Sequence, residues 1–595
     1  MKFHSTLLLF LATSLAAADG TLRVRTLDKD TAKPLHCRVS IKGSDGQWRW
    51  GKDLAGADLV YGGLARMWSS GDLSVPLPPG EAEVVVSRPF EYLPFTGKVL
   101  IKEGETANLD VQLERLINLA ERGWFGGDIH VHVVHGEKHF KVDIPTVVPI
   151  SRAEGESWVS FAQAWTSVTD RQPTPVQLEE ICKKLCDEQY LCGWGMEHPK
   201  DHLGHMAAFP INKTLTYLEA VGGNDYHAYT SRTGLRNGLT HFEILRGLKA
   251  CESLAMYSHP TREYGGTKES VGNIGREIPF DVIAAPASLE ALDIFCDAPR
   301  HENDEKLAYY LLNRGLRFAI CGLTDVCYDR KGGERPGDTR TYVYLPPGTP
   351  RTFPQIVKAV RARHTFATTG PLLAFSIDKA GIGDVLEAGK GALQGQVEAW
   401  MAIDYNDPAK PAGLNRIEIL RNGVVWKTFP ANGERTAKLN FEVNESGDAW
   451  YAARVIGTEK TQIAISSPIF FQTAAYKPPV PATAIVKATV EDAAGKKLDG
   501  TVRAIEFSVT GSREVSKAEF KNGAFMIKCP ADCRIEISAP GFETQSKSLF
   551  LDVEEIYDEM FLPIRRAQLI DDAFYEKVRR ALENVELKIK MEKGK

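Results

Sequence analysis

Four of the chain's 14 histidines lie within ten residues, in the stretch GGDIHVHVVHGEKHF that spans residues 126–140. The closest pair, His130 and His132, is separated by one valine. If this segment is a β-strand, alternate side chains face the same side, so both imidazoles can bind one cation while Ile129 and Val131 pack behind them. The pattern predicts half of a metal-binding shell, and a pair of exposed strand histidines is the alternative.

Other potential metal ligands recur where apolar runs of the sequence end. The strand ends of an α/β barrel converge on one mouth, so ligands placed there can meet the histidine pair. The residues at these positions are Glu197 in CGWGMEHP, His205 in DHLGHMAAF, His259 in LAMYSHP and Asp325 in FAICGLTDV.

Three further residues of the histidine-rich stretch have less certain roles. Asp128 precedes His130 by two residues on the same strand face, and we expect it to orient an imidazole through the second ring nitrogen. His135 and His139 follow in a predicted loop. Each is either an additional metal ligand or substrate contact, or a solvated loop histidine.

These residues belong to a predicted central domain, residues 119–375, in which short apolar runs alternate with helical ones such as VQLEEICKKLCDEQY and FPQIVKAVRAR. Alternating strands and helices predict an α/β domain, plausibly a barrel. The flanking regions, 19–118, 376–475 and 485–565, carry short alternating runs broken by Gly and Pro, which predict β-sandwiches. A charged periodic stretch, 566–595, predicts a C-terminal helix.

The first and last sandwiches have similar sequence patterns, which indicates an internal duplication. Both resemble the carboxypeptidase-regulatory type of sandwich, through Lys-Pro-Leu at 33–35 or Lys-Lys-Leu at 496–498 and the later SRPFEY or SAPGFE segment. The resemblance implies a scaffolding role. Among ten cysteines, Cys529 and Cys533 form the best candidate disulfide.

The first 18 residues, with Lys2, an apolar run and Ala16-Ala17-Ala18, are typical of a secretory signal peptide. Removing them changes the formal charge from -5 to -6, because Lys2 is lost. An acidic chain without long basic runs is not expected to bind nucleic acid, and no apolar run is long enough to span a bilayer. We therefore expect an exported protein, periplasmic or extracellular, that meets a small-molecule or polymer-derived partner.

The motif order HxH, Glu followed by His, SHP and a strand-ending Asp resembles the PHP (polymerase and histidinol phosphatase) superfamily over residues 120–375. Within it, GWFGGDIHVH, GDTRTYVYLP and RARHTFATTGPLL resemble the CehA/McbA-type metallohydrolases. This resemblance implies a distorted (β/α)7 barrel that holds divalent metal ions, zinc, manganese or iron, and a hydrolase that uses metal-activated water on a phosphoester, ester, amide or carbamate bond.

Carried over by motif, the resemblance implies six metal ligands shared by two ions, with Glu197 bridging: His130, His132, Glu197, His205, His259 and Asp325. The chain departs from the family at FAQAWTSVTD (161–170) and at Asp325-Val326-Cys327, where histidines are expected. Their loss implies two metal ions and makes a third doubtful. Cys327 is either a thiolate ligand or a packed thiol.

No residue is an obvious proton donor for a leaving group. Arg340 and Asp201, which lie near the motif segments, are weak catalytic candidates, and an internal salt bridge or solvated charge is the alternative for each.

A different class of function stays open beside the hydrolase. In that alternative, an altered, non-catalytic barrel keeps metal for structure and the chain binds a glycan or another ligand.

Overall fold

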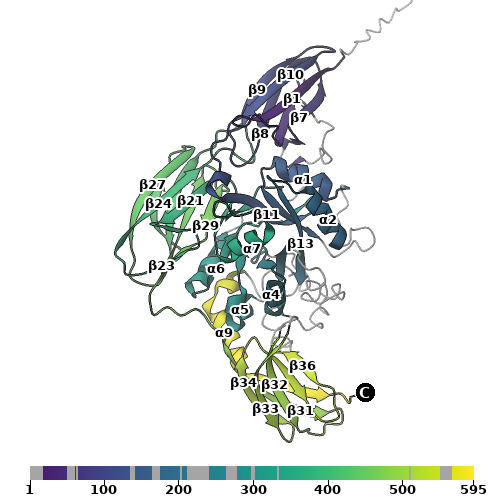
Figure 1. The fold of residues 1–595 in the computed structure, drawn as a ribbon, viewed down its shortest axis with the longest axis vertical. Coiled ribbons are helices and arrows are strands. Elements are labelled where there is room, and N and C mark those ends of the chain that lie inside the picture. Colours follow the sequence, from purple (N-terminus) through teal and green to yellow (C-terminus); the bar gives the residue numbers. More distant parts are fainter. Residues whose placement is uncertain are drawn as a thin grey trace, which may run out of the picture.

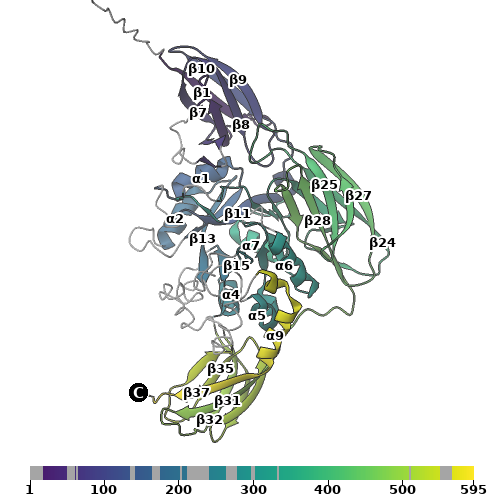
Figure 2. The ribbon, with the colours of Figure 1, turned by 180° about the vertical axis from the view of Figure 1, so that it is seen from behind.

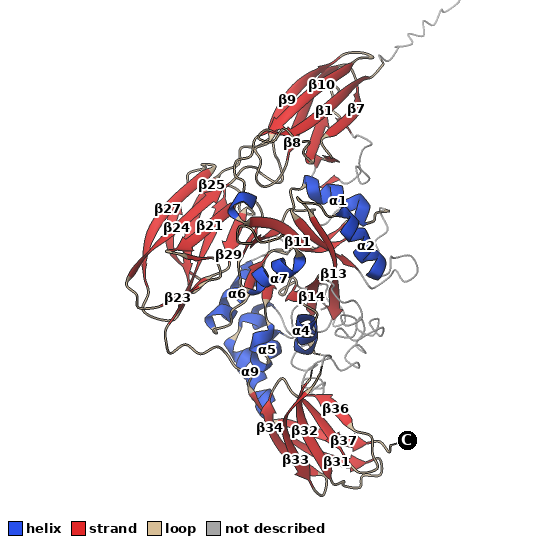
Figure 3. Ribbon diagram, in the orientation of Figure 1, coloured by secondary structure: helices blue, strands red, loops and turns tan. Residues whose placement is uncertain are grey.

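The chain forms three β-sandwiches around a central domain that contains most of its helices, as seen in a computed structural model (Figures 1 and 3). Figure 1 shows the first sandwich at one end of an elongated molecule, the C-terminal sandwich at the other, and the second sandwich beside the central domain. The structure describes residues 18–49, 60–61, 64–134, 141–163, 175–200, 204–210, 240–262, 278–296, 302–330, 334–507, 511–549 and 566–594. The predicted signal peptide lies outside these residues, except for Ala18.

The N-terminal sandwich packs the sheet β10-β1-β7 against the sheet β3-β2-β8-β9. Strand β1 alternates buried and more exposed residues, so Leu22 and Val24 face the hydrophobic core of the sandwich. The strands are β1 (Gly20–Asp28), β2 (Cys37–Lys42), β3 (Trp48–Arg49), β4 (Val60–Tyr61), β5 (Leu64–Ala65), β6 (Met67–Ser69), β7 (Asp72–Leu77), β8 (Gly80–Ser87), β9 (Phe95–Ile101) and β10 (Thr106–Leu113).

The C-terminal sandwich has the same arrangement of strands. Its first strand pairs in parallel with its last, as β1 pairs with β10, and its two sheets are β34-β31-β37 and β33-β32-β35-β36. The strands are β31 (Thr483–Asp492), β32 (Gly500–Glu506), β33 (Arg513–Phe520), β34 (Ala524–Pro530), β35 (Arg534–Ser538), β36 (Gln545–Ser548) and β37 (Val585–Met591).

The last 30 residues differ from the single helix expected for 566–595. A short 3-10 helix, η6 (Arg566–Ile570), and helix α9 (Asp572–Glu583) are followed by strand β37, so the prediction of one helix is wrong for this part. The reason is visible in VELKIKM, where apolar and charged residues alternate with the period of a strand. Figure 2 shows α9 lying between the central domain and the C-terminal sandwich.

The middle sandwich pairs the sheet β22-β21-β24-β27 with strands that continue the sheet of the central domain. Its core is aromatic and aliphatic, with Phe441, Val443 and Tyr451 buried. The strands are β21 (Leu372–Ile377), β22 (Ala380–Gly381), β23 (Val385–Glu387), β24 (Ala392–Trp400), β25 (Leu414–Arg421), β26 (Val424–Pro430), β27 (Thr436–Asn444), β28 (Ala449–Gly457), β29 (Ile463–Ser466) and β30 (Ile469–Gln472).

The central sheet has the order β17-β16-β15-β14-β13-β12-β11-β19-β20 and then runs on through β29, β28, β25 and β26 of the middle sandwich. Its strands are β11 (Trp124–His132), β12 (Trp158–Gln163), β13 (Leu191–Lys200), β14 (Gly204–Phe209), β15 (Leu254–Tyr257), β16 (Ala291–Asp293), β17 (Ala319–Cys321), β18 (Val326–Cys327), β19 (Arg340–Tyr344) and β20 (Thr365–Thr368).

Helices cover this sheet and connect its strands (Figure 3). Helix α1 begins after Asp143, whose carboxylate accepts a hydrogen bond from the Thr146 amide, and α4 begins with a capping box between Thr240 and Glu243. The helices are η1 (Ala120–Arg122), α1 (Ile144–Ala153), α2 (Pro175–Leu185), α4 (His241–Ala250), α5 (Ile278–Ala284), η4 (Pro286–Ser288), α6 (Glu302–Asn313) and α7 (Phe353–Arg361).

The predicted (β/α)7 barrel is wrong. The described strands form a mixed, mostly β architecture, in which β13, β14 and β15 pair antiparallel and β11 pairs antiparallel with β19. The strand order is open, and it continues into a sandwich through β20 and β29. Alternating apolar runs and helices are compatible with open and closed sheets alike, since closure depends on pairings between distant strands.

None of the described helices is long and apolar enough to cross a membrane.

Candidate metal centre

The structure brings all six predicted metal ligands into one buried cluster. They come from three strands of one sheet and two loops: His130 and His132 on β11, Glu197 on β13, His205 on β14, His259 just after β15, and Asp325 just before β18. All are buried or largely so. Because neighbouring strands of one sheet carry the ligands, the sheet itself sets their spacing.

Four of these side chains form the tightest group. His130, Glu197, His259 and Asp325 each offer one ligand atom, and these atoms lie within 4.8 Å of one another. His130 Nε2 lies 3.4 Å from Glu197 Oε1 and 3.2 Å from Asp325 Oδ1. His259 Nε2 lies 3.4 Å from Glu197 Oε1. Two imidazoles and two carboxylates around one point are donors that suit zinc, manganese or iron.

His132 and His205 extend this group on two sides. His132 Nε2 lies 3.2 Å from Glu197 Oε2 and 3.3 Å from Asp325 Oδ1. His205 Nδ1 lies 2.5 Å from Glu197 Oε1. The carboxylate of Glu197 therefore contacts several imidazoles at once, which is the geometry expected of a bridging ligand.

Two ligand residues have backbone conformations that L-amino acids rarely adopt. His259 has φ of 35° and Asp325 has φ of 56°. Left-handed conformations of residues other than glycine cost free energy and persist where the surrounding structure imposes them, often at functional sites. His259 follows β15 and Asp325 precedes β18, and the side chains of both lie in the cluster.

Two buried aspartates hold these backbone turns in place. Asp128 accepts hydrogen bonds from the His130 amide at 3.0 Å and from the Thr324 hydroxyl at 2.5 Å. Asp293 accepts hydrogen bonds from the His259 amide at 3.2 Å and from the Leu323 amide at 3.3 Å. Each carboxylate thus joins two ligand-bearing segments of the chain.

The contacts of Asp128 differ from the expected one to an imidazole nitrogen, since Asp128 accepts from the backbone amide of His130. Asp293 was not predicted from the sequence. The sequence gives little signal for it, because Asp293 lies inside the apolar run ALDIFC and not at its end.

Arg262 is a second residue that the sequence did not indicate. Its guanidinium donates to Asp325 Oδ2 at 2.9 Å and to Glu334 Oε1 at 3.2 Å. The Asp325 carboxylate therefore contacts both Arg262 and the histidines. Arg262, in the loop after β15, fixes the orientation of this carboxylate.

The electrostatics of the cluster reflect two carboxylates buried among imidazoles. Burial opposes the charged form of His132, but the hydrogen bonds that it donates to Asp325 and Glu197 outweigh this effect and raise its pKa to about 10. Burial likewise opposes the charged form of Glu197, yet the neighbouring His205 and His130 lower its pKa well below the usual range. Burial lowers the pKa of His259. The cluster therefore concentrates negative charge that favours a cation.

Other predicted residues are placed differently. Cys327 on β18 lies beside His132 in register, and burial raises the pKa of its thiol, which favours the packed thiol over a thiolate ligand. His135, His139 and Asp201 lie outside the described residues.

Arg340 is fully buried and binds the protein's own backbone. Its guanidinium donates to the carbonyl oxygens of Gly337, Pro89 and Glu154 and lies 4.2 Å from the ring centroid of Phe90. These contacts join the N-terminal sandwich to the central domain, so Arg340 has a structural role through carbonyl oxygens and a ring and not through the internal salt bridge that was the alternative.

A buried acid, Glu156, lies near Asp128 without being part of the cluster. Its Oε2 accepts a hydrogen bond from the Ser151 hydroxyl at 2.6 Å. Burial raises the pKa of Glu156 to about 8, and the charge of Asp128 adds to this shift. The folded chain therefore keeps a proton on Glu156 that the unfolded chain releases above pH 4.5.

This proton makes stability depend on pH. The contribution of neutral Glu156 to the free energy of unfolding is fully present below pH 4.5 and is lost as the pH rises through about 8. The variant Glu156→Gln, which is neutral at every pH, is expected to raise the free energy of unfolding by a few kcal/mol near pH 8 and to change it little below pH 4.5. Urea denaturation at both pH values measures this, and an equal effect at both would contradict it.

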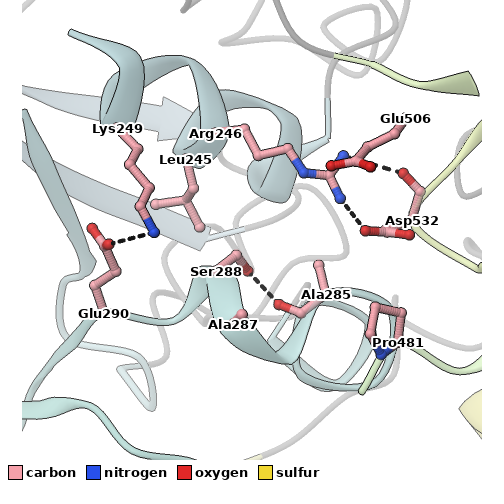
Figure 4. Close-up of a pocket in the computed structure, with 10 residues that line it drawn as sticks. All are labelled: Leu245, Arg246, Lys249, Ala285, Ala287, Ser288, Glu290, Pro481, Glu506 and Asp532. Carbon is pink, nitrogen blue, oxygen red and sulfur yellow. Dashed lines mark hydrogen bonds and ion pairs between the residues drawn. The ribbon is translucent and has the colours of Figure 1, made fainter. Parts of the chain in front are cut away.

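A separate cavity of about 230 Å³ lies where helix α4 and η4 meet the C-terminal sandwich (Figure 4). Its charged lining residues pair with one another: Arg246 with Asp532, and Lys249 Nζ with Glu290 Oε1 at 3.5 Å. Nearby, Arg534 binds Glu243 of α4 through two hydrogen bonds of 2.6 and 2.8 Å. The pairs Arg246–Asp532 and Arg534–Glu243 hold the C-terminal sandwich against the central domain, whereas Lys249 and Glu290 both belong to the central domain.

Comparison with known proteins gives no assignment. No protein-family model matches the chain, and no curated protein matches it. Among solved structures, the major pilin subunit BcpA of Bacillus cereus is 9% identical over 97% of this chain and 100% of that one, with a TM-score of 0.19. The Bacillus anthracis TIE protein is 9% identical over 97% of this chain and 51% of its own, with a TM-score of 0.14.

A shaft pilin, SpaA from Lactobacillus rhamnosus GG, is 10% identical over 38% of this chain and 99% of its own, with a TM-score of 0.11. At these TM-scores the likenesses carry no argument about this chain's fold or function. The predicted membership of the CehA/McbA-type PHP metallohydrolases is nevertheless wrong, because no family model and no curated protein matches the chain. The predicted hydrolase activity was implied by that resemblance and is wrong with it.

Proposed function

We propose that the chain is an exported, non-catalytic binding protein whose central domain holds a divalent metal ion for structural purposes. The observation that supports a metal ion is the close grouping of four side chains, whose ligand atoms lie within 4.8 Å of one another: His130, Glu197, His259 and Asp325. The left-handed backbone of His259 and Asp325 supports it, because the fold maintains a costly conformation at two of the four ligands. His132 and His205 can complete the shell or hold a second ion.

A structural ion should be measurable by its removal. An ion present at about a thousand times its dissociation constant stabilises the folded state by about 4 kcal/mol, so a chelator is expected to lower the unfolding temperature and zinc or manganese to restore it. Elemental analysis should find metal in the wild type and in His364→Ala, a variant of a histidine in contact with Asp384 outside the cluster. It should find far less in His130→Ala.

Equal metal content in His130→Ala and wild type would contradict the metal site. Hydrolysis of p-nitrophenyl esters that is lost in His130→Ala would contradict the non-catalytic part of the proposal. The two outcomes are independent, since one is an elemental measurement and the other a rate.

We propose the middle sandwich as the place where a polymer such as a glycan binds. Strand β26 ends the order of the large sheet, and three successive side chains on it are exposed: Val424 at 70%, Val425 at 41% and Trp426 at 37%. The Trp426 ring packs edge-on against Tyr451 at 5.5 Å. A rigid, partly exposed indole offers apolar contact area at low entropic cost.

Replacement of Trp426 with alanine tests this surface. The variant is expected to lose about tenfold in affinity for a retained polysaccharide, the effect of removing a central aromatic contact. Retention on a panel of insoluble polysaccharides is the measurement, with Val480→Ala, which removes an apolar side chain exposed elsewhere, as the control. Equal retention of both variants, or no retention of the wild type, would overturn the glycan proposal and leave the metal proposal intact.

A further inference from the structure

Three cysteines meet where helix α2 ends and strand β13 begins. Cys182 lies on α2, Cys186 follows its last residue, and Cys192 is the second residue of β13. Cys182 and Cys192 are buried, whereas Cys186 is partly exposed. Cys37, by contrast, lies in the core of the N-terminal sandwich.

The sulfur atoms of the three cysteines are in contact with neighbouring members of the group. The Cys192 amide donates to Cys186 Sγ at 3.2 Å, and Cys186 Sγ lies 3.2 Å from the carbonyl oxygens of both Cys182 and Cys192. The side chains of Cys182 and Cys192 also interact, and this interaction together with burial raises the pKa of the Cys192 thiol. A disulfide requires two cysteine side chains to lie close together, and the contacts of Cys186 with both Cys182 and Cys192 place all three cysteines in one group.

We propose that Cys182 and Cys192 form a disulfide, with Cys186 as the thiol through which an oxidant first reacts. The oxidant is a disulfide, either of a small thiol or of a thiol oxidoreductase, as exported proteins meet in oxidising compartments. The bridge joins α2 to the beginning of β13, the strand that carries Glu197 five residues further on.

The chemistry balances as two successive thiol-disulfide exchanges. The thiolate of Cys186 attacks one sulfur of the oxidant, forms a mixed disulfide and releases one thiol. The thiolate of Cys192 then attacks Cys186 Sγ and releases the second thiol, and the thiolate of Cys182 attacks Cys192 Sγ and regenerates Cys186. In total two protein thiols are oxidised by two electrons, one oxidant disulfide is reduced to two thiols, and their protons are carried by those thiols.

The step order follows from exposure. Cys186 is the member of the trio that solvent reaches, whereas Cys182 and Cys192 are buried and meet a dissolved oxidant poorly. Burial raises the pKa of the Cys186 thiol, so exchange is expected to be faster at mildly alkaline pH.

The test treats the full chain with oxidised glutathione under native conditions, blocks the remaining thiols with an alkylating reagent and maps the bridges by mass spectrometry of a digest. The expected product carries a Cys182–Cys192 crosslink, lacks two hydrogen atoms and leaves Cys186 alkylated. A crosslink between Cys529 and Cys533, whose side chains also interact, appears in a different peptide and does not interfere.

Variants assign the roles. Cys182→Ala is expected to abolish the crosslink, Cys186→Ala to slow its formation severalfold, and Cys37→Ala to change nothing. A bridge that involves Cys186 in the final product, or alkylation of both Cys182 and Cys192 after oxidation, overturns the proposal. Mapping of the wild type alone decides this, so the test holds if a variant does not fold.

Discussion

The variant Glu197→Gln is expected to lose metal affinity by at least about 100-fold, because even partners outside the ligand shell change affinity by about 10–100-fold. Glu197 contacts His130, His132, His205 and His259 through its two oxygens. Glutamine keeps the size of the side chain but removes the charge and replaces one ligand oxygen with an amide nitrogen that does not bind metal.

Titration calorimetry with zinc or manganese on chelator-treated protein measures this affinity. A matched control is Glu398→Gln, which makes the same substitution on the middle sandwich, where the carboxylate pairs with Arg122 and Lys438 at the surface. The control is expected to bind metal as the wild type does. Wild-type affinity in Glu197→Gln would mean that the ion, if bound, lies elsewhere.

The variant Glu154→Ala is expected to destabilise the chain by about 3–5 kcal/mol, the cost of leaving a buried charge without its partner. Glu154 accepts hydrogen bonds from Arg38 Nε at 2.7 Å and Trp68 Nε1 at 2.6 Å. Both partners belong to the N-terminal sandwich, while Glu154 follows helix α1 of the central domain. Removal of the carboxylate therefore weakens the contact between two domains.

Chemical denaturation measures this loss. An exposed pair serves as control: Arg23→Ala removes the partner of Asp72 on the outer face of the N-terminal sandwich and is expected to cost about 0–1 kcal/mol. The double variant Arg38→Met/Glu154→Leu is expected to recover much of the lost stability, because no charge stays buried. A loss as small for Glu154→Ala as for Arg23→Ala would show that the domain contact does not depend on this pair.

Several features of the site follow from local sequence patterns. The alternation in DIHVH places His130 and His132 on one face of a strand whatever the surrounding fold. The ends of apolar runs indicated where Glu197, His259 and Asp325 would lie. Period-two alternation indicated the sandwiches, and the same rule applied to VELKIKM would have identified β37.

Other features depended on contacts between distant parts of the chain. The sheet stays open and continues into the middle sandwich because β20 pairs with β29, a pairing across about a hundred residues that no local pattern encodes. The roles of Asp293 and Arg262 arise from loops that the sheet brings together. Arg340 looks like a binding residue in sequence, and only its burial against Pro89 and Phe90 shows that it is structural.

The sequence by itself determined which residues have the chemistry to hold a cation and which strand face the first two occupy, because residue type and strand period are local properties. Only the tertiary structure decided that the six side chains meet, that two of them do so from left-handed backbone, and that the sheet carrying them is open. Those outcomes depend on strand pairings and loop closures between residues far apart in the sequence. The free energy of these contacts depends on the packing of the whole folded chain.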